Sequence, residues 1–376
     1  MRSRAEQVIV ITAANQWDER RMADHQLASA ISGHADVLYV DPPSLRRPEI
    51  VTEADSGGRI TVLRPVRLPL ARLRAVAYLN RYLSALQVRV ALRRCRPGRI
   101  TLLEANMTSP VAGLIGEDAV VYWAQDDWQG LAPLVGLNGN TLERNERLLV
   151  RDADAVIAAN PLLAKRISEQ RADVFLIPFG VTTEVFERMS VRADVADEGC
   201  AVLMGTLNTR IDFDILEAVV RAGVRLIIAG PVTEPAVGGR LADLVQSGLV
   251  EHVGAVPFES LPDVLGRACV GLVPYDHSRF NEGSFPLKTL EYLSAGLPVV
   301  ATDLPAIRWL NSPDVRIADQ PEAFAEAVSD LVGRGIPRPA QRSRRVEFAR
   351  QHDWRTRAQE FAQVLGVVVT PVASAS

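Results

Sequence analysis

The sequence has few lysines, cysteines and histidines. Its 376 residues include two lysines, Lys165 and Lys288, against 40 arginines. The three cysteines, Cys95, Cys200 and Cys269, lie far apart without the paired spacing of a zinc site, and an odd number argues against a secreted disulfide framework. The five histidines do not cluster either. The sequence therefore predicts a reducing, cytoplasmic compartment, with no metal site and no bound cofactor.

Long apolar runs are also missing. No run approaches the ~20 residues that a membrane-spanning helix needs. The charged N-terminus is followed only by the short apolar run at residues 8–12, which predicts a first strand and not a signal peptide. Hydrophobic residues make up 48% and charged residues 23%, which excludes wholesale disorder and suits two domains of similar size.

The net charge of -3 conceals a basic stretch. Residues 64–99 contain ten arginines and no Asp or Glu. This stretch is either an ordinary solvated face or a surface for anionic lipid or a phosphate-bearing acceptor. Within it, residues 68–94 predict an amphipathic helix, which either rests on a membrane or lies in the interior with an arginine edge. We expect no nucleic-acid partner.

Short apolar runs alternate with longer helical stretches along the chain. Because most are apolar along their whole length, they are typical of parallel strands covered on both faces. The predicted strands are residues 8–12, 37–40, 60–65, 100–103, 120–123, 155–158, 174–177, 201–204, 226–229, 250–253, 270–273, 299–301 and 315–317.

The predicted fold class is α/β, with two Rossmann-like domains facing a central cleft. The N-terminal domain would span residues 1–180 and the C-terminal domain residues 187–345. Pro178 and Gly180 break the pattern directly after a strand, which indicates the boundary between them.

The C-terminal end predicts a helix and a tail. An imperfect apolar stripe predicts a helix over residues 346–366, within a helical segment that begins near residue 340. Residues 367–376 end in small polar side chains and are expected to be flexible.

The most informative segment is residues 279–305, RFNEGSFPLKTLEYLSAGLPVVATDLP. Ser284 as N-cap, Pro286 in the first turn and Gly296 as the stop predict a helix of about eleven residues between two strands. The start of this helix would lie at the edge of the sheet where open α/β folds bind nucleotides. Its free N–H groups and its dipole favour a diphosphate.

Lys288 and Glu291 lie in this helix, one turn apart. The ammonium of Lys288 would neutralise the diphosphate and the departing nucleotide, and the Glu291 carboxylate would accept from the ribose hydroxyls. The alternative is an ordinary surface ion pair at helical spacing. The position at the helix start, and the choice of lysine in an arginine-rich chain, favour the functional interpretation.

The pattern F-P-L-K-T-L-E-Y-L-S-A-G-L-P-V-V-A-T resembles the donor-binding signature of glycosyltransferase family 4 and its bacterial relatives. The resemblance implies the GT-B fold, with the C-terminal helix crossing back toward the N-terminal domain, and metal-independent transfer. It also implies that Lys288 contacts the diphosphate and Glu291 the ribose. The family motif has a second glutamate, whose position falls on Gly283, whereas the nearest acid is Glu282. Donor sugar and stereochemistry therefore stay open.

Other donor-site residues follow from the C-terminal half. Gly205 follows the strand at residues 201–204 and permits close backbone approach, and Arg210 is a second candidate for the diphosphate or else a solvated loop arginine. The complete predicted donor site is Gly205, Arg210, Tyr275, Glu282, Ser284, Phe285, Leu287, Lys288 and Glu291.

The N-terminal half would bind the acceptor. Residues 15–28 and the following V-L-Y-V-D-P-P resemble polysaccharide and teichuronic-acid-type transferases, which points to Trp17 and Asp18. An inverting enzyme would need a general base, for which Asp126 and Asp127, directly after a predicted strand, are the first candidates and Asp18 the second. Trp128 could stack on a sugar. The alternative is an aspartate that caps the next helix beside packed tryptophans, and a retaining enzyme would need no such base.

The sequence thus predicts a hexosyltransferase that moves a sugar from a nucleotide diphosphate sugar, with UDP or GDP favoured, to a glycan or lipid-linked glycan in surface polysaccharide synthesis. It would be cytoplasmic, or peripheral at the inner face of the plasma membrane through residues 64–99. Two alternatives stay open, a sugar-nucleotide epimerase of the same fold and a non-catalytic scaffold protein.

Overall fold

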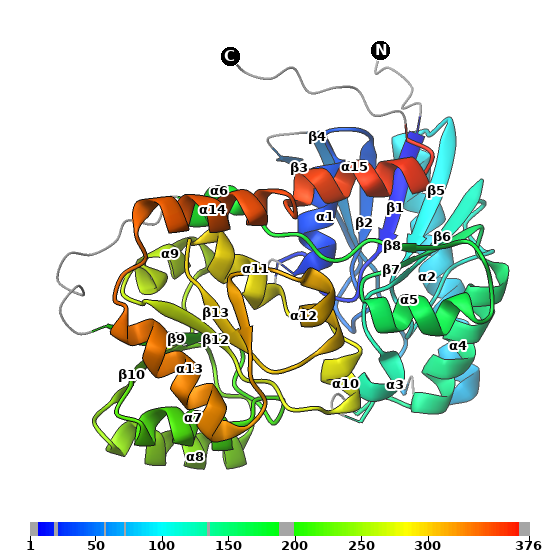
Figure 1. Ribbon diagram of the computed structural model, residues 1–376. Helices are drawn as coiled ribbons and strands as arrows, with labels where there is room; N and C mark the ends of the chain where they lie inside the picture. The colour runs from blue at the N-terminus through cyan, green and yellow to red at the C-terminus, as the bar shows by residue number, and fades with distance from the viewer. Residues whose placement is uncertain are drawn as a thin grey trace. The chain divides into compact units, whose positions relative to one another are not determined.

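The computed structural model describes residues 7–18, 22–55, 58–70, 73–133, 136–187 and 199–367 (Figure 1). The chain forms two compact units. Domain 1 comprises Met1–Pro178 and Trp354–Ser376, and domain 2 comprises Phe179–Asp353. Most of the predicted C-terminal tail lies outside the described residues. Among the described helices, none has the length and the apolar character that a bilayer crossing requires.

Domain 1 is built on an eight-stranded sheet with the order β3-β4-β2-β1-β5-β6-β7-β8. All neighbouring strands are parallel except β3 and β4, which form an antiparallel pair. The strands are β1 (Gln7–Thr12), β2 (Asp36–Val40), β3 (Glu49–Asp55), β4 (Gly58–Arg64), β5 (Arg99–Glu104), β6 (Ala119–Ala124), β7 (Ala155–Ala158) and β8 (Val174–Leu176).

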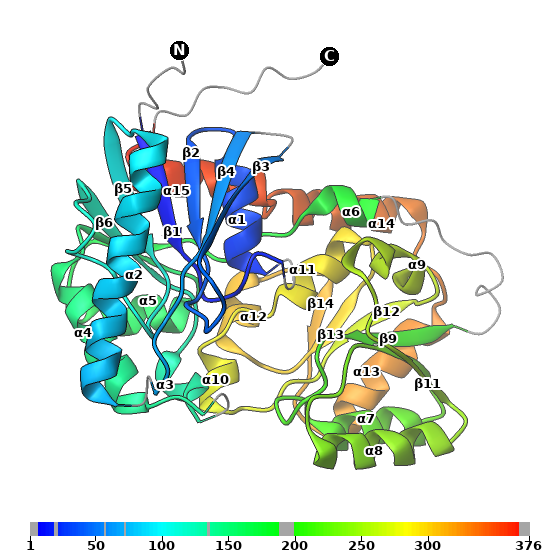
Figure 2. The ribbon, with the colours of Figure 1, turned by 180° about the vertical axis from the view of Figure 1, so that it is seen from behind.

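Helices cover both faces of this sheet. The apolar runs of β1 and β6 are buried because α2 packs on one face, whereas α1 and α15 pack against each other on the opposite side (Figures 1 and 2). On the α15 side, the rings of Trp123 and Phe361 meet edge to face at 5.1 Å. The helices are α1 (Ala23–Ile31), α2 (Arg74–Cys95), α3 (Trp128–Leu131), α4 (Gly139–Asp152), α5 (Pro161–Ser168) and α15 (Trp354–Val364).

Domain 2 is built on a six-stranded parallel sheet with the order β11-β10-β9-β12-β13-β14. Its strands are β9 (Cys200–Met204), β10 (Arg225–Ala229), β11 (Val250–Gly254), β12 (Val270–Val273), β13 (Val299–Ala301) and β14 (Val315–Ile317). Because these strands are parallel and adjacent, the carboxyl ends of β10, β9, β12 and β13 lie side by side.

The helices of domain 2 form two layers. Helices α7 and α13 pack together beside the sheet, and α11 packs against β12, β13, α14 and α6 (Figure 1). The helices are α6 (Thr183–Glu187), α7 (Phe213–Arg221), α8 (Pro235–Gln246), α9 (Leu261–Leu265), α10 (Arg279–Glu282), α11 (Leu287–Ser294), α12 (Pro305–Leu310), α13 (Pro321–Gly333) and α14 (Pro339–Arg350), with a short 3-10 turn at Phe258–Ser260.

The single C-terminal helix predicted over residues 346–366 is wrong in one respect. The structure divides it into α14, which ends at Arg350, and α15, which begins at Trp354. Between them the chain bonds to another segment of domain 2. The amide of Val181 donates to the carbonyl of His352 (3.0 Å), and the amide and hydroxyl of Thr183 donate to the Asp353 carboxylate (3.1 and 2.8 Å). The predicted return to the N-terminal domain is confirmed, since α15 belongs to domain 1.

Candidate functional site

Helix α11 begins later than the sequence predicted. Its N-cap is Pro286 and it has eight residues, because the short helix α10 takes up the preceding loop. The hydroxyl of Ser284 donates to the carbonyl of Asn281 (3.2 Å) and closes the turn after α10, so the predicted N-cap role is wrong. The end is as predicted, since Gly296 follows the last turn with φ at +77°.

Tyr292 anchors α11 to the sheet. Its side chain is fully buried and its hydroxyl accepts from the amide of Met204, at the end of β9 (2.8 Å). The ring packs against Gly271 on β12, where an added Cβ would lie 2.2 Å from a ring carbon. Burial raises the pKa of Tyr292 well above its ordinary value. Sequence reasoning missed this residue, although the adjacent Glu291 was singled out.

Lys288 and Glu291 form an ion pair near the start of α11. The ammonium of Lys288 donates to Oε2 of Glu291 at 2.7 Å. The carboxylate side chain is 7% exposed and the lysine side chain 26%. The ion pair at helical spacing that the sequence left as an alternative is thus present, but its carboxylate is buried, which is not typical of a surface pair. Neither side chain is directed wholly into bulk water.

Two glycines follow β9 and β10, and the first of them, Gly205, lies beside this pair. Gly205 has φ at +132°, a conformation open mainly to glycine, and an added Cβ would lie 3.6 Å from Cε of Lys288. At Gly230 an added Cβ would come within 1.7 Å of the Gly205 carbonyl oxygen. The structure thus brings Gly205 together with Lys288 and Glu291, which were predicted from a separate segment.

Arg210 contacts one other predicted donor residue, Tyr275, and two residues that were not predicted. Its guanidinium carbon lies 5.3 Å from the centroid of the Tyr275 ring, and Ile211 and Tyr275 form an antiparallel bridge. The Phe280 ring lies closer, at 4.3 Å, and Nε of Arg210 donates to Oδ1 of Asn281 at 2.8 Å. Sequence reasoning named neither Phe280 nor Asn281 as a contact of this arginine.

The remaining donor-site predictions have different surroundings. Phe285 is buried in an aromatic cluster, with its ring 6.2 Å from Phe179 and 6.4 Å from Trp309. Glu282 ends α10 and Leu287 begins α11, and both are half-buried. Packing with two other aromatic rings explains why Phe285 is apolar, so its part in a donor site stays a prediction.

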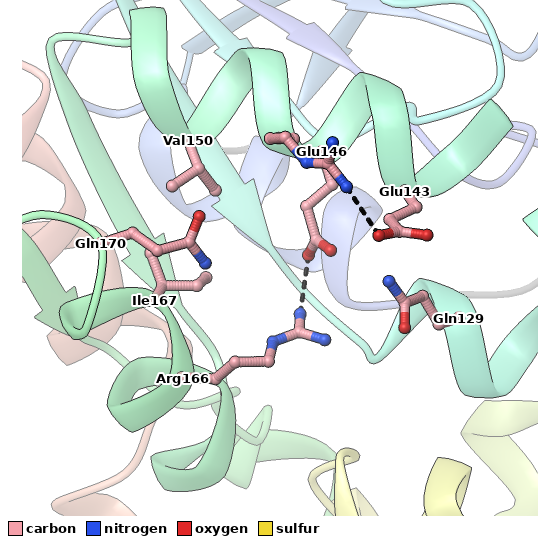
Figure 3. Close-up of a pocket in the computed structure, with 8 residues that line it drawn as sticks. Gln129, Glu143, Glu146, Val150, Arg166, Ile167 and Gln170 are labelled. Atoms are coloured by element: carbon pink, nitrogen blue, oxygen red, sulfur yellow. Dashed lines mark hydrogen bonds and ion pairs between the residues drawn. The ribbon is translucent and has the colours of Figure 1, made fainter. Parts of the chain in front are cut away.

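Asp127 makes the contacts expected of the alternative in which this aspartate caps the next helix. It is the N-cap of α3, where its carboxylate accepts from the amide of Gln129 (3.2 Å), and it pairs with Arg166 (3.1 Å). Arg166 also pairs with Glu146 (2.8 Å) at a pocket of about 210 Å³ between α3, α4 and α5 (Figure 3). Asp126 is less buried than Asp127. The catalytic role of either aspartate stays a prediction.

The predicted acceptor residues follow β1 and β6. Trp17 is buried, with its ring stacked on His25 at 3.9 Å. Asp18 pairs with Arg64 at the end of β4. Trp128 is buried at the start of α3. Because β5 lies between β1 and β6, Trp17 and Trp128 belong to separate parts of this sheet edge.

Two buried carboxylates at the same edge were not foreseen. Asp41, after β2, accepts from the amide of Trp17 (2.9 Å), and burial raises its pKa to about 6. Glu104, at the end of β5, bonds to Thr12 and accepts from the amides of Val111 and Ala112 (2.7 and 3.1 Å). Burial raises the pKa of Glu104 to about 7. Both residues follow apolar strand positions, but their burial depends on contacts with distant loops.

Comparison with known proteins indicates the class of enzyme. Residues 204–334 match the family model of the glycosyl transferases group 1. The putative teichuronic acid biosynthesis glycosyltransferase TuaH of Bacillus subtilis (strain 168) is 24% identical over 391 aligned positions, which cover 95% of this chain and 97% of the relative.

Solved structures match the whole chain. Sucrose-phosphate synthase from Thermosynechococcus elongatus has a TM-score of 0.71 at 17% identity and covers 96% of this chain and 98% of its own. Anabaena HepE in complex with UDP and glucose has a TM-score of 0.66 at 13% identity, covering 96% and 99%. The fold is therefore GT-B, as predicted. With its group 1 domain, the chain is a glycosyltransferase, as the resemblance of the α11 segment implied.

Proposed function

We propose that this glycosyltransferase takes its sugar from a nucleotide diphosphate sugar bound by domain 2, without the help of a metal ion. The observation that carries the proposal is the Lys288–Glu291 pair, which lies beside the Gly205 backbone at the carboxyl edge of the sheet. Nucleotides bind at this edge in open α/β sheets. The HepE structure, a fold relative, was determined with UDP and glucose, which favours UDP as the nucleotide here.

In this proposal the residues of domain 2 stabilise the departing nucleoside diphosphate. As the bond to the sugar breaks, negative charge grows on the diphosphate, and the ammonium of Lys288 with the guanidinium of Arg210 would neutralise it. The first-turn N–H groups of α11 would donate to the same oxygens. The Glu291 carboxylate would accept from the ribose hydroxyls, and the ammonium already held against it would compensate its charge.

We propose a glycan or lipid-linked glycan of surface polysaccharide synthesis as the acceptor. The name of the TuaH relative, which covers nearly the whole chain, supports this class. If transfer inverts the sugar, a carboxylate must reach the acceptor hydroxyl. Asp126 suits that role better than Asp127, since Asp127 caps α3 and pairs with Arg166.

We also propose an anionic membrane surface as a partner, which would place the protein at the inner face of the plasma membrane. Helix α2 is apolar on two sides. Its inner side buries Val88 and Leu92 in the core of domain 1. Its outer side exposes the large side chains Tyr78, Leu79, Tyr82, Leu86 and Val90, each by 43% to 59%. A helix of a soluble protein is ordinarily polar on its outer side, and a continuous exposed apolar stripe indicates an interaction surface.

Charge favours lipid as the occupant of this surface. Arg89, Arg93 and Arg94 are exposed along the same helix, and none of the ion pairs found among the described residues involves them. Apolar side chains flanked by unpaired arginines are the combination that binds the interface of anionic bilayers.

Nucleotide binding and turnover test the enzymatic proposal. A thermal-shift panel of UDP, GDP, TDP and ADP should show stabilisation by one of them, and the matching sugar nucleotide should release that diphosphate when an acceptor is added. C2 epimers formed from the sugar nucleotide alone would instead indicate the epimerase. Absence of nucleotide binding by calorimetry would favour the scaffold protein and refute the transferase proposal for this site.

Vesicle flotation tests the membrane proposal. The protein should float with vesicles of phosphatidylcholine and phosphatidylglycerol at low salt, and less with phosphatidylcholine alone. Leu86→Ser should reduce flotation, whereas Val245→Ser, which changes an exposed apolar side chain of α8, should not. No binding to anionic vesicles at low salt would remove the proposal, and self-association lost in Leu86→Ser would assign the stripe to a second copy of the chain.

A further inference from the structure

The side chain of Asn281 is completely buried between two loops of domain 2. One hydrogen of its Nδ2 is donated to the carbonyl of Arg210 (3.0 Å), and the other is shared between the carbonyl (3.0 Å) and the carboxylate (2.5 Å) of Asp276. Its Oδ1 accepts from Nε of Arg210 (2.8 Å). One amide thus joins the loop after β9 to the loop after β12, with both of its ends hydrogen-bonded.

These contacts fix the orientation of Arg210. The Phe280 and Tyr275 rings lie 4.3 and 5.3 Å from its guanidinium carbon, and Nε is held by Asn281. In the described part of the chain, the two Nη groups have no hydrogen-bond partner, and Arg210 is only half-buried. The open edge of a guanidinium is the edge that binds phosphate oxygens in pairs.

We propose that Asn281 is a positioning residue that holds Arg210 with its Nη edge directed at the diphosphate of the donor. The inference rests on the proposed function, since the donor supplies the diphosphate. Asn281 does not touch the donor itself. It acts by restricting the long side chain of Arg210 before the ligand binds, so less conformational entropy is lost on binding.

The chemistry of the site explains why an amide is present and not a carboxylate. A side chain at this position must accept from Arg210 at one end and donate to the Asp276 carboxylate at the other. An aspartate would keep the first bond, but it would face the Asp276 carboxylate with like charge. It would also place a negative charge against Arg210, which would then compete with the diphosphate for the guanidinium.

Calorimetry with the nucleoside diphosphate that binds best among UDP, GDP, TDP and ADP tests the inference. Asn281→Ala and the near-isosteric Asn281→Asp should each bind it roughly 10-fold more weakly or worse, the range of one charge-assisted contact. Arg210→Ala should show a similar loss. Because Asn281 acts through Arg210, adding Asn281→Ala to Arg210→Ala should cause little further loss.

The double variant separates positioning from a general structural role. If Asn281→Ala weakens binding by the same factor with and without Arg210, the residue only supports the loops and the inference is overturned. Wild-type affinity in a folded Asn281→Asp overturns it as well, and this variant serves if Asn281→Ala does not fold. If the wild-type protein binds none of the four diphosphates, the proposed function is refuted instead. If Lys288→Ala weakens binding but neither variant of Asn281 does, only the role of Asn281 is refuted.

Discussion

Replacing Lys288 with alanine would leave the carboxylate of Glu291 without its ammonium partner. At 2.7 Å the pair attracts by about 6 kcal/mol at an effective dielectric constant of about 20, before the cost of desolvation is subtracted. Removing one member of a buried pair typically costs ~3–5 kcal/mol. Because the lysine side chain is 26% exposed, we expect the lower end, about 3 kcal/mol of the free energy of unfolding.

A second substitution separates stability from donor binding. In Lys288→Ala/Glu291→Gln no unpaired charge remains, so most of the lost stability should return. Affinity for the nucleoside diphosphate should not return, because the ammonium that would contact it is still missing. One charge-assisted contact is worth ~1.5–3 kcal/mol, which corresponds to a loss of roughly 10- to 100-fold.

Urea unfolding and titration calorimetry measure the two quantities on the same samples. Lys165→Ala is the matched control, since it removes the other lysine of the chain from an exposed position on α5. It should change neither quantity. If Lys288→Ala/Glu291→Gln bound the diphosphate as tightly as the wild type, Lys288 would serve only to neutralise Glu291, and the donor assignment would be wrong.

Four further substitutions test other parts of the structure. Gly271→Ala should destabilise domain 2 by ~3 kcal/mol through overpacking against Tyr292, and an unchanged thermal midpoint would contradict the packing. With an inverting reaction, Asp126→Asn should lower turnover at least ~100-fold, whereas full activity in both Asp126→Asn and Asp127→Asn would indicate another base or a retaining route. Burial raises the pKa of Glu104 from 4.5 to about 7, so the stability it contributes is complete below pH ~4.5 and decreases as pH rises to about 7. Between pH 5 and 8 the free energy of unfolding in urea should fall by up to ~3 kcal/mol more in the wild type than in Glu104→Gln. If the free energies of the two proteins change in parallel with pH, the raised pKa is refuted.

The strands could be predicted because their signal is local. Both faces of a central parallel strand are buried, so runs such as 8–11 and 270–273 contain no polar side chain and can be predicted without knowledge of their neighbours. The strand β3 was missed for the same reason. Its sequence EIVTEAD contains three acidic residues, and it pairs antiparallel with β4 at the edge of the sheet, where continuous apolarity is not required.

Helix ends were less predictable, because they depend on partners distant in sequence. The break between α14 and α15 coincides with bonds from Val181 and Thr183, about 170 residues earlier in the chain. Ser284 has the side chain of a good N-cap, but its hydroxyl is used by the turn after α10. In both cases the local sequence is compatible with the predicted helix end, but a hydrogen bond within domain 2 accompanies a different one.

The candidate site shows the same division between local and distant causes. Lys288 and Glu291 could be singled out because a helix start and a spacing of three residues are written in one segment, and the close approach of Gly205 followed from its place after a strand. Asn281 could not, since an asparagine between Phe280 and Glu282 looks like any polar loop residue until Arg210, 71 positions earlier, is placed against it. Its complete burial therefore carries information that composition does not. A buried amide with both ends bonded is costly to misplace, so its bond to Nε constrains the side chain of Arg210 at this edge of the sheet.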